Sequence, residues 1–394
     1  MSPRACGRDR PLRVLHIAHG KVFGGIETLL VTLARQCHLT PQMFPDFALC
    51  YDARVASELR SAGARVFMLG ETRASRPYSV LRARAVLRDV LAATSYDIVV
   101  CHSVWPQAVF GPVVSRTILP LVFWQHGRLT GTHWTERWAR RCRPSAALCN
   151  SYFTERTLDR VYPQLAREVV YCPVAPPGDL CPRTSRASVR KALGTSDSSI
   201  VIVQACRMER WKGHISLIRA LGALRENSTW TCWLVGGAQG HSEEKYELEL
   251  RAIAQSAGIG DRVVFCGQRS DVPDILAAAD IFCQPNTEGE PFGIAFVEAL
   301  LAGLPVAATS IGGAAEIVDE TCGILVTAGC SEELGGALDH LLRDHALRAR
   351  LAAGGRTRAH TLCDPLARLT QLAGVLASLV AFPATTEGCA NEFI

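Results

Sequence analysis

Short apolar runs alternate with amphipathic segments along this chain, and the whole pattern occurs twice. In the first half, the runs that predict strands are Leu12–Ala18, Phe47–Cys50, Arg65–Leu69, Ile98–His102, Leu121–Gln125, Ala147–Cys149 and Val169–Tyr171. In the second half they are Ile200–Cys206, Thr231–Val235, Val263–Cys266, Ile281–Gln284, Pro305–Thr309 and Gly323–Val326. Strands that alternate with helices are typical of parallel sheets covered on both faces. The chain is therefore predicted to be an α/β protein.

A proline-rich segment, Cys172–Pro182, separates the two halves and is the best linker in the sequence. We therefore predict two Rossmann-like domains, residues 1–175 and 183–364, followed by a C-terminal helix and tail over 365–394. Ligands of open α/β sheets bind beyond the carboxyl ends of the strands. Two such sheets are expected to face each other across a central cleft.

Composition favours a soluble globular protein, with 48% hydrophobic and 20% charged residues in 394. The apolar run Val14–Ala18 is too short for a signal peptide, and no stretch reaches the ~20 apolar residues of a membrane span. The expected location is the cytoplasm. The 16 cysteines form no C-x-x-C pair, so we expect reduced thiols rather than disulfides or a structural metal.

Positive charge is concentrated in the first half. Residues 1–175 carry 23 basic and 12 acidic residues, a net charge of +11, whereas the remainder carries 19 and 25, a net charge of −6. Clusters at Arg73–Arg88 and Arg128–Arg143 could contact anionic lipid headgroups or an acidic acceptor. A plain solvated surface is an equal alternative, since only four of the 42 cations are lysines. Nucleic acid is not an expected partner, because basic and aromatic residues are not interleaved.

The segment from Thr287 to Gly303 places two carboxylates, Glu290 and Glu298, around a predicted helix start at Gly293. Free N–H groups at such a start, including those of Ile294 and Ala295, suit an anion. The two carboxylates could then hold hydroxyls on either side of a phosphate, as in a nucleotide sugar. Taken alone, the two acids could also be solvated surface residues.

In each half, a further group of candidate phosphate-binding residues follows the first predicted strand. Gly24 and Gly25 open the first predicted helix, over Gly25–His38, and would let a phosphate approach the backbone, although they could form an ordinary tight turn. Arg207 and Lys212 could converge on a diphosphate, although they could be surface charges. The glycines do not form the G-x-G-x-x-G of nicotinamide enzymes.

These motifs occur in an order that resembles the retaining glycosyltransferases of family 4, which have the GT-B fold. The similarity rests on Glu290 to Glu298 (E-x7-E), on Gly24 to Glu27 (GG-x-E), on Arg207 to Gly213 (R-x4-K-G) and on the Val235-Gly236-Gly237 turn. It covers nearly the whole chain. The resemblance also implies that the C-terminal helix packs back on the first domain.

The resemblance implies transfer of a sugar from a UDP- or GDP-sugar to an acceptor hydroxyl with retention of configuration. Arg207 and Lys212 would then bind the diphosphate, Glu290 the sugar hydroxyls and Glu298 the ribose. His126 would lie beside the donor sugar and His102 nearer the acceptor, although each could instead be a structural hydrogen-bonding group. Gly24, Gly25, Gly293, Ile294 and Ala295 would offer the phosphate-binding backbone.

No Asp-x-Asp motif is present, so neither a metal nor another cofactor is expected. The expected acceptor is a surface polysaccharide or a lipid-linked sugar, with a peripheral contact to the inner membrane face; a soluble small molecule is the alternative. A non-catalytic nucleotide-sugar sensor and a nucleotide-sugar epimerase are the other functions considered. The E-x7-E context fits the epimerase poorly.

Overall fold

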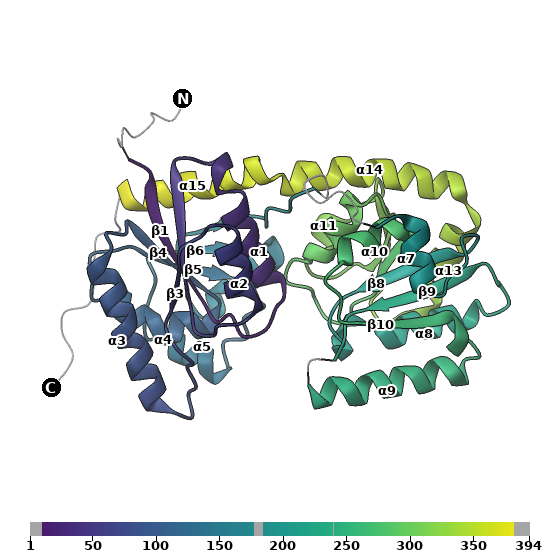
Figure 1. Cartoon of the computed structure of the whole chain (residues 1–394), viewed down its shortest axis with the longest axis horizontal. Helices are drawn as coiled ribbons and strands as arrows, with labels where there is room; N and C mark the ends of the chain where they lie inside the picture. The colour runs from purple at the N-terminus through teal and green to yellow at the C-terminus, as the bar shows by residue number, and fades with distance from the viewer. Residues whose placement is uncertain (1–9, 177–183, 239, 382–394) are drawn as a thin grey trace. The chain divides into compact units, whose positions relative to one another are not determined.

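The computed structural model of this chain describes residues 10–176, 184–238 and 240–381 (Figure 1). They form two compact units. The first unit runs to Pro173 and takes up the chain again at Pro365, and the second runs from Val174 to Asp364.

The first unit is built on a seven-stranded parallel sheet in the order β3-β2-β1-β4-β5-β6-β7. Its strands are β1 (Leu12–Ala18), β2 (Met43–Leu49), β3 (Val66–Met68), β4 (Ile98–His102), β5 (Leu121–Gln125), β6 (Ala146–Cys149) and β7 (Arg167–Val169). Its α-helices are α1 (Gly25–Arg35), α2 (Arg54–Ser61), α3 (Pro77–Ala93), α4 (Val104–Val114), α5 (Trp134–Ala139), α6 (Tyr152–Glu155) and α15 (Pro365–Ala381). Short 3-10 turns, η1 (Cys37–Leu39) and η2 (Leu158–Arg160), complete it.

Helices cover both faces of this sheet. Helices α3, α4 and α5 lie on one face, and α1 and α2 lie on the other (Figure 1). Strands β1, β4, β5 and β6 are almost completely buried, with Val14, Leu15 and Ile17 of β1 inaccessible to solvent, because both sheet faces meet apolar helix surfaces. The edge strands β3 and β7 are partly exposed. The C-terminal helix α15 belongs to this unit: it contacts η1, and Gln371 Nε2 donates to the Val169 carbonyl at 3.0 Å.

The second unit has a six-stranded parallel sheet in the order β10-β9-β8-β11-β12-β13. Its strands are β8 (Ile200–Ala205), β9 (Trp230–Val235), β10 (Val263–Gly267), β11 (Ile281–Gln284), β12 (Val306–Thr309) and β13 (Gly323–Val326). Its α-helices are α7 (Arg186–Ala192), α8 (His214–Ala223), α9 (His241–Ser256), α10 (Val272–Ala278), α11 (Ile294–Leu301), α12 (Ala314–Ile317), α13 (Ser331–Arg343) and α14 (His345–Cys363). The 3-10 turns η4 (Arg210–Lys212) and η5 (Gly260–Arg262) lie between them.

The predicted α/β class and both Rossmann-like sheets are confirmed. In each sheet the first and fourth strands lie side by side at the centre, and the strand order reverses there. Loops that follow the two strands diverge at this point, so the carboxyl edge opens into the crevice in which α/β proteins bind ligands. The crevice lies after β1 and β4 in the first unit, and after β8 and β11 in the second.

Three predicted elements differ from the structure by two or more residues at an end. Strand β7 ends at Val169, not at Tyr171, because its pairing with β6 stops at Cys149 and the chain then leads to Pro173. Strand β2 begins earlier than predicted, at Met43, because Pro45 in a parallel register with Val14 does not interrupt it. Helix α1 ends at Arg35 and is followed by η1. The proline-rich linker falls largely on residues 177–183, outside the described residues.

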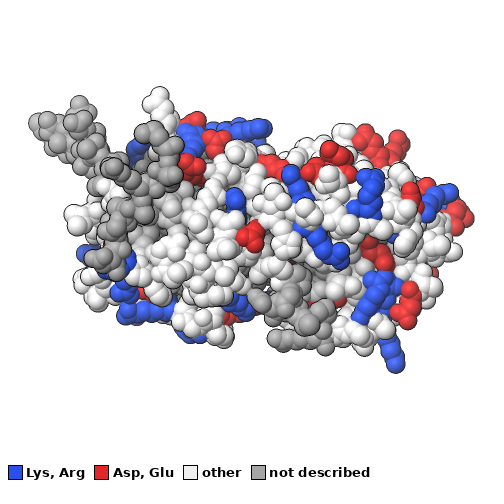
Figure 2. Space-filling view, turned by 90° about the horizontal axis from the view of Figure 1, so that it is seen from above, with Lys and Arg blue, Asp and Glu red and all other residues white. Residues whose placement is uncertain are grey.

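The described cysteines are all free thiols. Within the described ranges, every helix is too short or too polar to cross a membrane. On the face drawn in Figure 2, basic and acidic side chains alternate over the second unit, so its charges are mixed rather than gathered into one patch. The α3 segment of the first unit differs, because Arg76, Arg82 and Arg88 are exposed beside Tyr78 (79% exposed) and Leu81 (60% exposed).

Candidate functional site

The central crevice of the second unit brings together two residues that are 78 positions apart. Lys212 ends η4, which follows β8, and Glu290 lies in the loop after β11. Because β8 and β11 are hydrogen-bonded neighbours, the Lys212 Nζ reaches Glu290 Oε2 at 2.5 Å. Both side chains are largely buried, with 12% and 10% exposed.

Glu290 is held through one of its two oxygens. Besides the Lys212 ammonium, Oε2 accepts hydrogen bonds from Asn286 Nδ2 at 2.9 Å and from Gln284 Nε2 at 3.2 Å. Every side-chain hydrogen bond found for Glu290 among the described residues ends on Oε2. The other oxygen, Oε1, is therefore the one that can accept a hydrogen bond from a ligand hydroxyl.

Two glycine contacts set the backbone positions of this pair. Gly213, directly after Lys212, has φ +77°, and a Cβ there would lie 1.8 Å from the Pro285 carbonyl oxygen. Gly312 (φ +67°) forms an isolated parallel bridge with Glu290, and the next N–H, of Gly313, donates to the Glu290 carbonyl at 2.7 Å. The loops after β8, β11 and β12 thus pack backbone against backbone, which only glycine permits.

Helix α11 begins directly behind Glu290. Gly293 caps it in the left-handed conformation (φ +100°), and the N–H of Phe296 donates back to the Gly293 carbonyl. The N–H groups of Ile294 and Ala295 have no acceptor among the described residues. Such free N–H groups carry the positive end of the helix dipole and suit a phosphate oxygen.

Glu298 lies on α11, one turn beyond these N–H groups, and its carboxylate is half-buried. Loss of hydration on burial raises its pKa from 4.5 to about 7. No hydrogen-bond donor to this carboxylate is found in the described part of the chain. A ligand that offers hydroxyl donors would therefore find a carboxylate without competing partners.

Arg207 and Lys212 pair with different carboxylates in the structure. Arg207 is exposed, and its guanidinium pairs with Glu209 at 2.8 Å. The guanidinium of Arg210 forms an ion pair with Glu249 and lies 4.7 Å from the centre of the Tyr246 ring. The predicted diphosphate pair is therefore one buried lysine and one surface arginine.

In the first unit, Gly24 and Gly25 lie where the chain passes from β1 into α1. Gly24 is the N-cap residue, and its N–H donates to Glu27 Oε2 at 3.1 Å. A Cβ on Gly24 would meet nothing closer than 3.7 Å. The contacts around Gly24 within the described residues therefore leave room for a Cβ at this position.

His126 directly follows β5 and is joined to two other histidines. His102 Nδ1 lies 2.9 Å from His126 Nε2, and His102 Nε2 lies 2.9 Å from His16 Nδ1. Desolvation lowers the pKa of His16 and of His126 to about 3, and that of His102 well below its usual value. These imidazoles are neutral at physiological pH.

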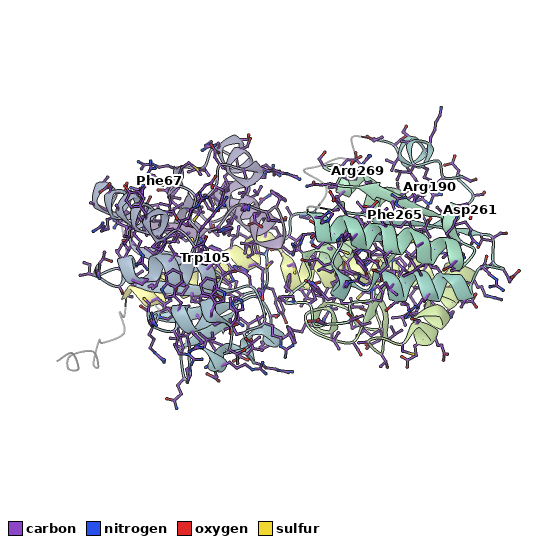
Figure 3. All side chains as sticks on the ribbon, turned by 90° about the horizontal axis from the view of Figure 1, so that it is seen from below. Phe67, Trp105, Arg190, Asp261, Phe265 and Arg269 are labelled. Atoms are coloured by element: carbon purple, nitrogen blue, oxygen red, sulfur yellow. The ribbon has the colours of Figure 1, made fainter. Side chains whose placement is uncertain are left out.

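Two cavities adjoin these histidines in the first unit. One, of about 180 Å³, is lined by residues that include Ser103, His126, Arg128 and Glu136. The other, of about 370 Å³, is lined by residues that include His19, Glu27 and His102. Trp105 borders both and is labelled in Figure 3.

Sequence reasoning missed Gln284, Asn286 and His16. Gln284 and Asn286 are buried polar residues at the end of an apolar strand, which is a signal that could have marked them. His16 lies inside the first strand, where a histidine also breaks the apolar pattern. Among the described residues, no group of three or more His, Cys, Asp or Glu side chains could hold a metal ion.

Residues 185–358 match the family model described as glycosyl transferases group 1. A D-inositol 3-phosphate glycosyltransferase of Xylanimonas cellulosilytica is 36% identical over 176 residues, which are 44% of this chain and 41% of that protein. The lipopolysaccharide core biosynthesis mannosyltransferase LpsB of Rhizobium meliloti is 27% identical over 247 residues, 62% of this chain and 68% of that protein. The chain thus spans about two fifths of the first of these curated relatives.

Among solved structures, HepE of Anabaena in complex with UDP and glucose aligns with a TM-score of 0.80 and 25% identity, over 93% of this chain and 100% of that chain. WaaG, a glycosyltransferase involved in lipopolysaccharide biosynthesis, shares the fold, with a TM-score of 0.69 and 18% identity over 92% of this chain and 99% of that one. The family match and these GT-B neighbours together support a glycosyltransferase.

Proposed function

We propose that this protein is a retaining glycosyltransferase of family 4 that uses a nucleoside diphosphate sugar, with UDP- and GDP-sugars as the first candidates. The observation that carries the proposal is the buried Lys212–Glu290 pair in front of the α11 N-terminus. It combines a cation, free N–H groups and an available carboxylate oxygen at the sheet crevice. This combination suits a diphosphate and the hydroxyls of a sugar.

In the proposed reaction, the acceptor oxygen bonds to the anomeric carbon while the bond from that carbon to the diphosphate oxygen breaks. The acceptor proton passes to the leaving diphosphate on the same face, which retains the configuration. Lys212, Arg207 and the N–H groups of Ile294 and Ala295 would stabilise the charge on the diphosphate. Glu290 Oε1 would accept from sugar hydroxyls and Glu298 from the ribose.

Gly24 and Gly25 are proposed to admit a phosphate to the first-unit backbone, and His126 to contact the donor sugar. The two cations would take the place of a metal, so activity is expected to persist in EDTA. For the acceptor, we propose a glycolipid or a surface polysaccharide, in keeping with the relatives that act in such pathways. We propose a cytoplasmic location with peripheral membrane contact.

The test is a donor screen of the purified protein with UDP-, GDP-, ADP- and dTDP-sugars in EDTA, read by thermal shift and by donor hydrolysis. One donor is expected to stabilise the protein and to be hydrolysed slowly. Lys212→Gln should reduce hydrolysis by at least about a hundredfold, because a developing charge loses its buried partner. Arg210→Gln is the matched control, since that cation is already paired with Glu249.

Binding without turnover, even with glycolipid extracts present, would favour a nucleotide-sugar sensor. Equal losses in Lys212→Gln and Arg210→Gln would remove the proposed role of the buried pair. No binding of any nucleotide sugar would refute the proposed function. Inversion of the anomeric configuration in the product would contradict the retaining mechanism alone.

A further inference from the structure

Three histidines of the first unit form a continuous hydrogen-bonded chain across neighbouring strands. His16 lies on β1, His102 ends β4, and His126 follows β5. The sheet order places β1, β4 and β5 side by side, so residues 110 positions apart in sequence are linked by two contacts of 2.9 Å. His102 uses both ring nitrogens in the chain.

The chain of three histidines carries no net charge. His16 is completely buried and His102 is 1% exposed, and their close ring neighbours are Phe47, Trp124 and each other. No carboxylate among the described residues contacts the three rings. Desolvation depresses all three pKa values, so each imidazole carries one proton.

A neutral imidazole has one donor and one acceptor nitrogen, which leaves only two arrangements that keep both hydrogen bonds. In one, His16 Nδ1–H donates to His102, and His102 Nδ1–H donates to His126 Nε2. The outer nitrogen, His126 Nδ1, then carries a proton. In the other arrangement every donor is reversed, and His126 Nδ1 is an acceptor.

The buried nitrogen His16 Nε2 decides between these two arrangements. His16 Nε2 is buried and has no hydrogen-bond partner in the described part of the chain. The reversed arrangement would place a proton on this nitrogen and bury an unpaired N–H, which folded proteins rarely do. The first arrangement leaves only a lone pair there.

We propose that His16 and His102 act as positioning residues that hold His126 in the Nδ1–H tautomer. His126 then offers a hydrogen-bond donor and no acceptor at its outer nitrogen. No partner for that nitrogen is found among the described residues, and His126 lines the cavity of about 180 Å³. The chain of histidines therefore favours a ligand oxygen that accepts a hydrogen bond at this position.

The tautomer follows from the first unit alone. Its use, donation to a hydroxyl or phosphate oxygen of the donor, rests on the proposed function. The three histidines thus give an uncharged hydrogen-bond donor at His126 Nδ1, and His16 and His102 set its tautomer without contacting the ligand. This role also explains why two histidines occupy buried strand positions that apolar residues usually fill.

The test is long-range ¹⁵N–¹H spectroscopy of histidine-labelled full-length protein at pH 7.5, which distinguishes protonated from unprotonated ring nitrogens. His16, His102 and His126 are each expected to show a protonated Nδ1 and an unprotonated Nε2. Assignments come from single variants, and His38→Gln, which removes an exposed histidine of the same unit, should leave the three signals unchanged. A protonated Nε2 on His126 or His16 would overturn the proposal.

Two variants of His16 test whether the buried end controls the outer one. His16→Asn can still donate from the Nδ1 position and should keep the tautomer of His126. His16→Phe removes this donor and leaves His102 Nε2 as the unpaired buried nitrogen. A lone pair is again favoured there, so His126 should keep Nδ1–H; a shift of His126 to Nε2–H would contradict the proposal. If His16→Phe does not fold, the wild-type spectrum and His16→Asn still decide.

Once a sugar donor that the enzyme uses is known, His102→Phe, which removes the hydrogen bond to His126 Nε2, should lower kcat/KM by about tenfold, the equivalent of one hydrogen bond. His102→Asn can still donate from the Nδ1 position and should restore most of it. The spectrum of the free protein is independent of this assay. Failure of the relay and failure of the proposed reaction are therefore distinguishable.

Discussion

At the scale of single residues, Glu298 links ligand binding to pH. Its raised pKa of about 7 reflects burial without a donor, so a bound hydroxyl should lower that pKa. Binding of the donor at pH 7 is expected to release about half a proton. Calorimetry in buffers of different ionisation enthalpy measures this, and Glu298→Gln should abolish it. A proton uptake would contradict the assigned role.

The same residue makes stability depend on pH in a defined direction. Because its pKa is higher in the folded protein than in the unfolded chain, Glu298 favours folding below about pH 4.5, and this contribution is lost as pH rises through about 7. Relative to Glu298→Gln, the wild type should therefore lose on the order of 1–3 kcal/mol between these limits. Urea unfolding of both proteins at pH 4.5 and 8 would test this; an unchanged difference would refute it.

Ser103 stores backbone strain beside the histidine chain. Its φ of 74° and ψ of 172° lie in a region that glycine adopts and other residues rarely do. Ser103→Gly is expected to raise the unfolding free energy by about 1 kcal/mol. Ser57→Gly, on the exposed face of α2, is the control and should lower it. A loss of stability in Ser103→Gly would show that the serine makes a compensating contact.

At the scale of elements, the turn between η4 and α8 holds the Lys212–Glu290 pair together. Gly213→Ala would drive a Cβ into the Pro285 carbonyl and separate the two loops, so we expect a loss of about 2 kcal/mol or more. Gly24→Ala meets no such obstacle and should change stability by less than about 0.5 kcal/mol. It should nevertheless weaken binding of the donor, since the methyl group would occupy space that a phosphate needs. Thermal unfolding and donor titration separate the two effects.

At the scale of the whole molecule, the net charge of +11 on residues 1–175 predicts attraction to anionic membranes. Helix α3 provides a suitable surface, with exposed Arg82 and Arg88 beside Tyr78 and Leu81. The wild type should sediment with vesicles that contain phosphatidylglycerol, and less so at high salt.

Arg82→Glu with Arg88→Glu is expected to lower the vesicle-bound to free ratio by at least about tenfold, since each basic residue contributes about 1 kcal/mol. Arg343→Glu with Arg350→Glu makes the same charge change on exposed positions of the second unit and serves as the control. Equal losses in both pairs would indicate a diffuse effect of net charge. No vesicle binding by the wild type would remove the membrane contact from the proposal.

The sequence by itself determined the positions of most strands and the starts of helices α1 and α11, because these depend on local periodicity and on glycine signals. It also marked Lys212, Glu290, Gly293 and Glu298, since each follows or begins an identifiable element. The end of β7 could not be read from sequence, because it depends on where pairing with β6 stops.

Only the tertiary structure decided which of these residues meet. Strand order places β8 beside β11 and β1 beside β4, and no local pattern encodes that order. It joins Lys212 to Glu290, leaves Arg207 with Glu209, and aligns His16, His102 and His126 through side chains that are far apart in sequence. The physical reason is that hydrogen bonds between buried polar groups require distances near 3 Å, which strand neighbours set and sequence spacing does not.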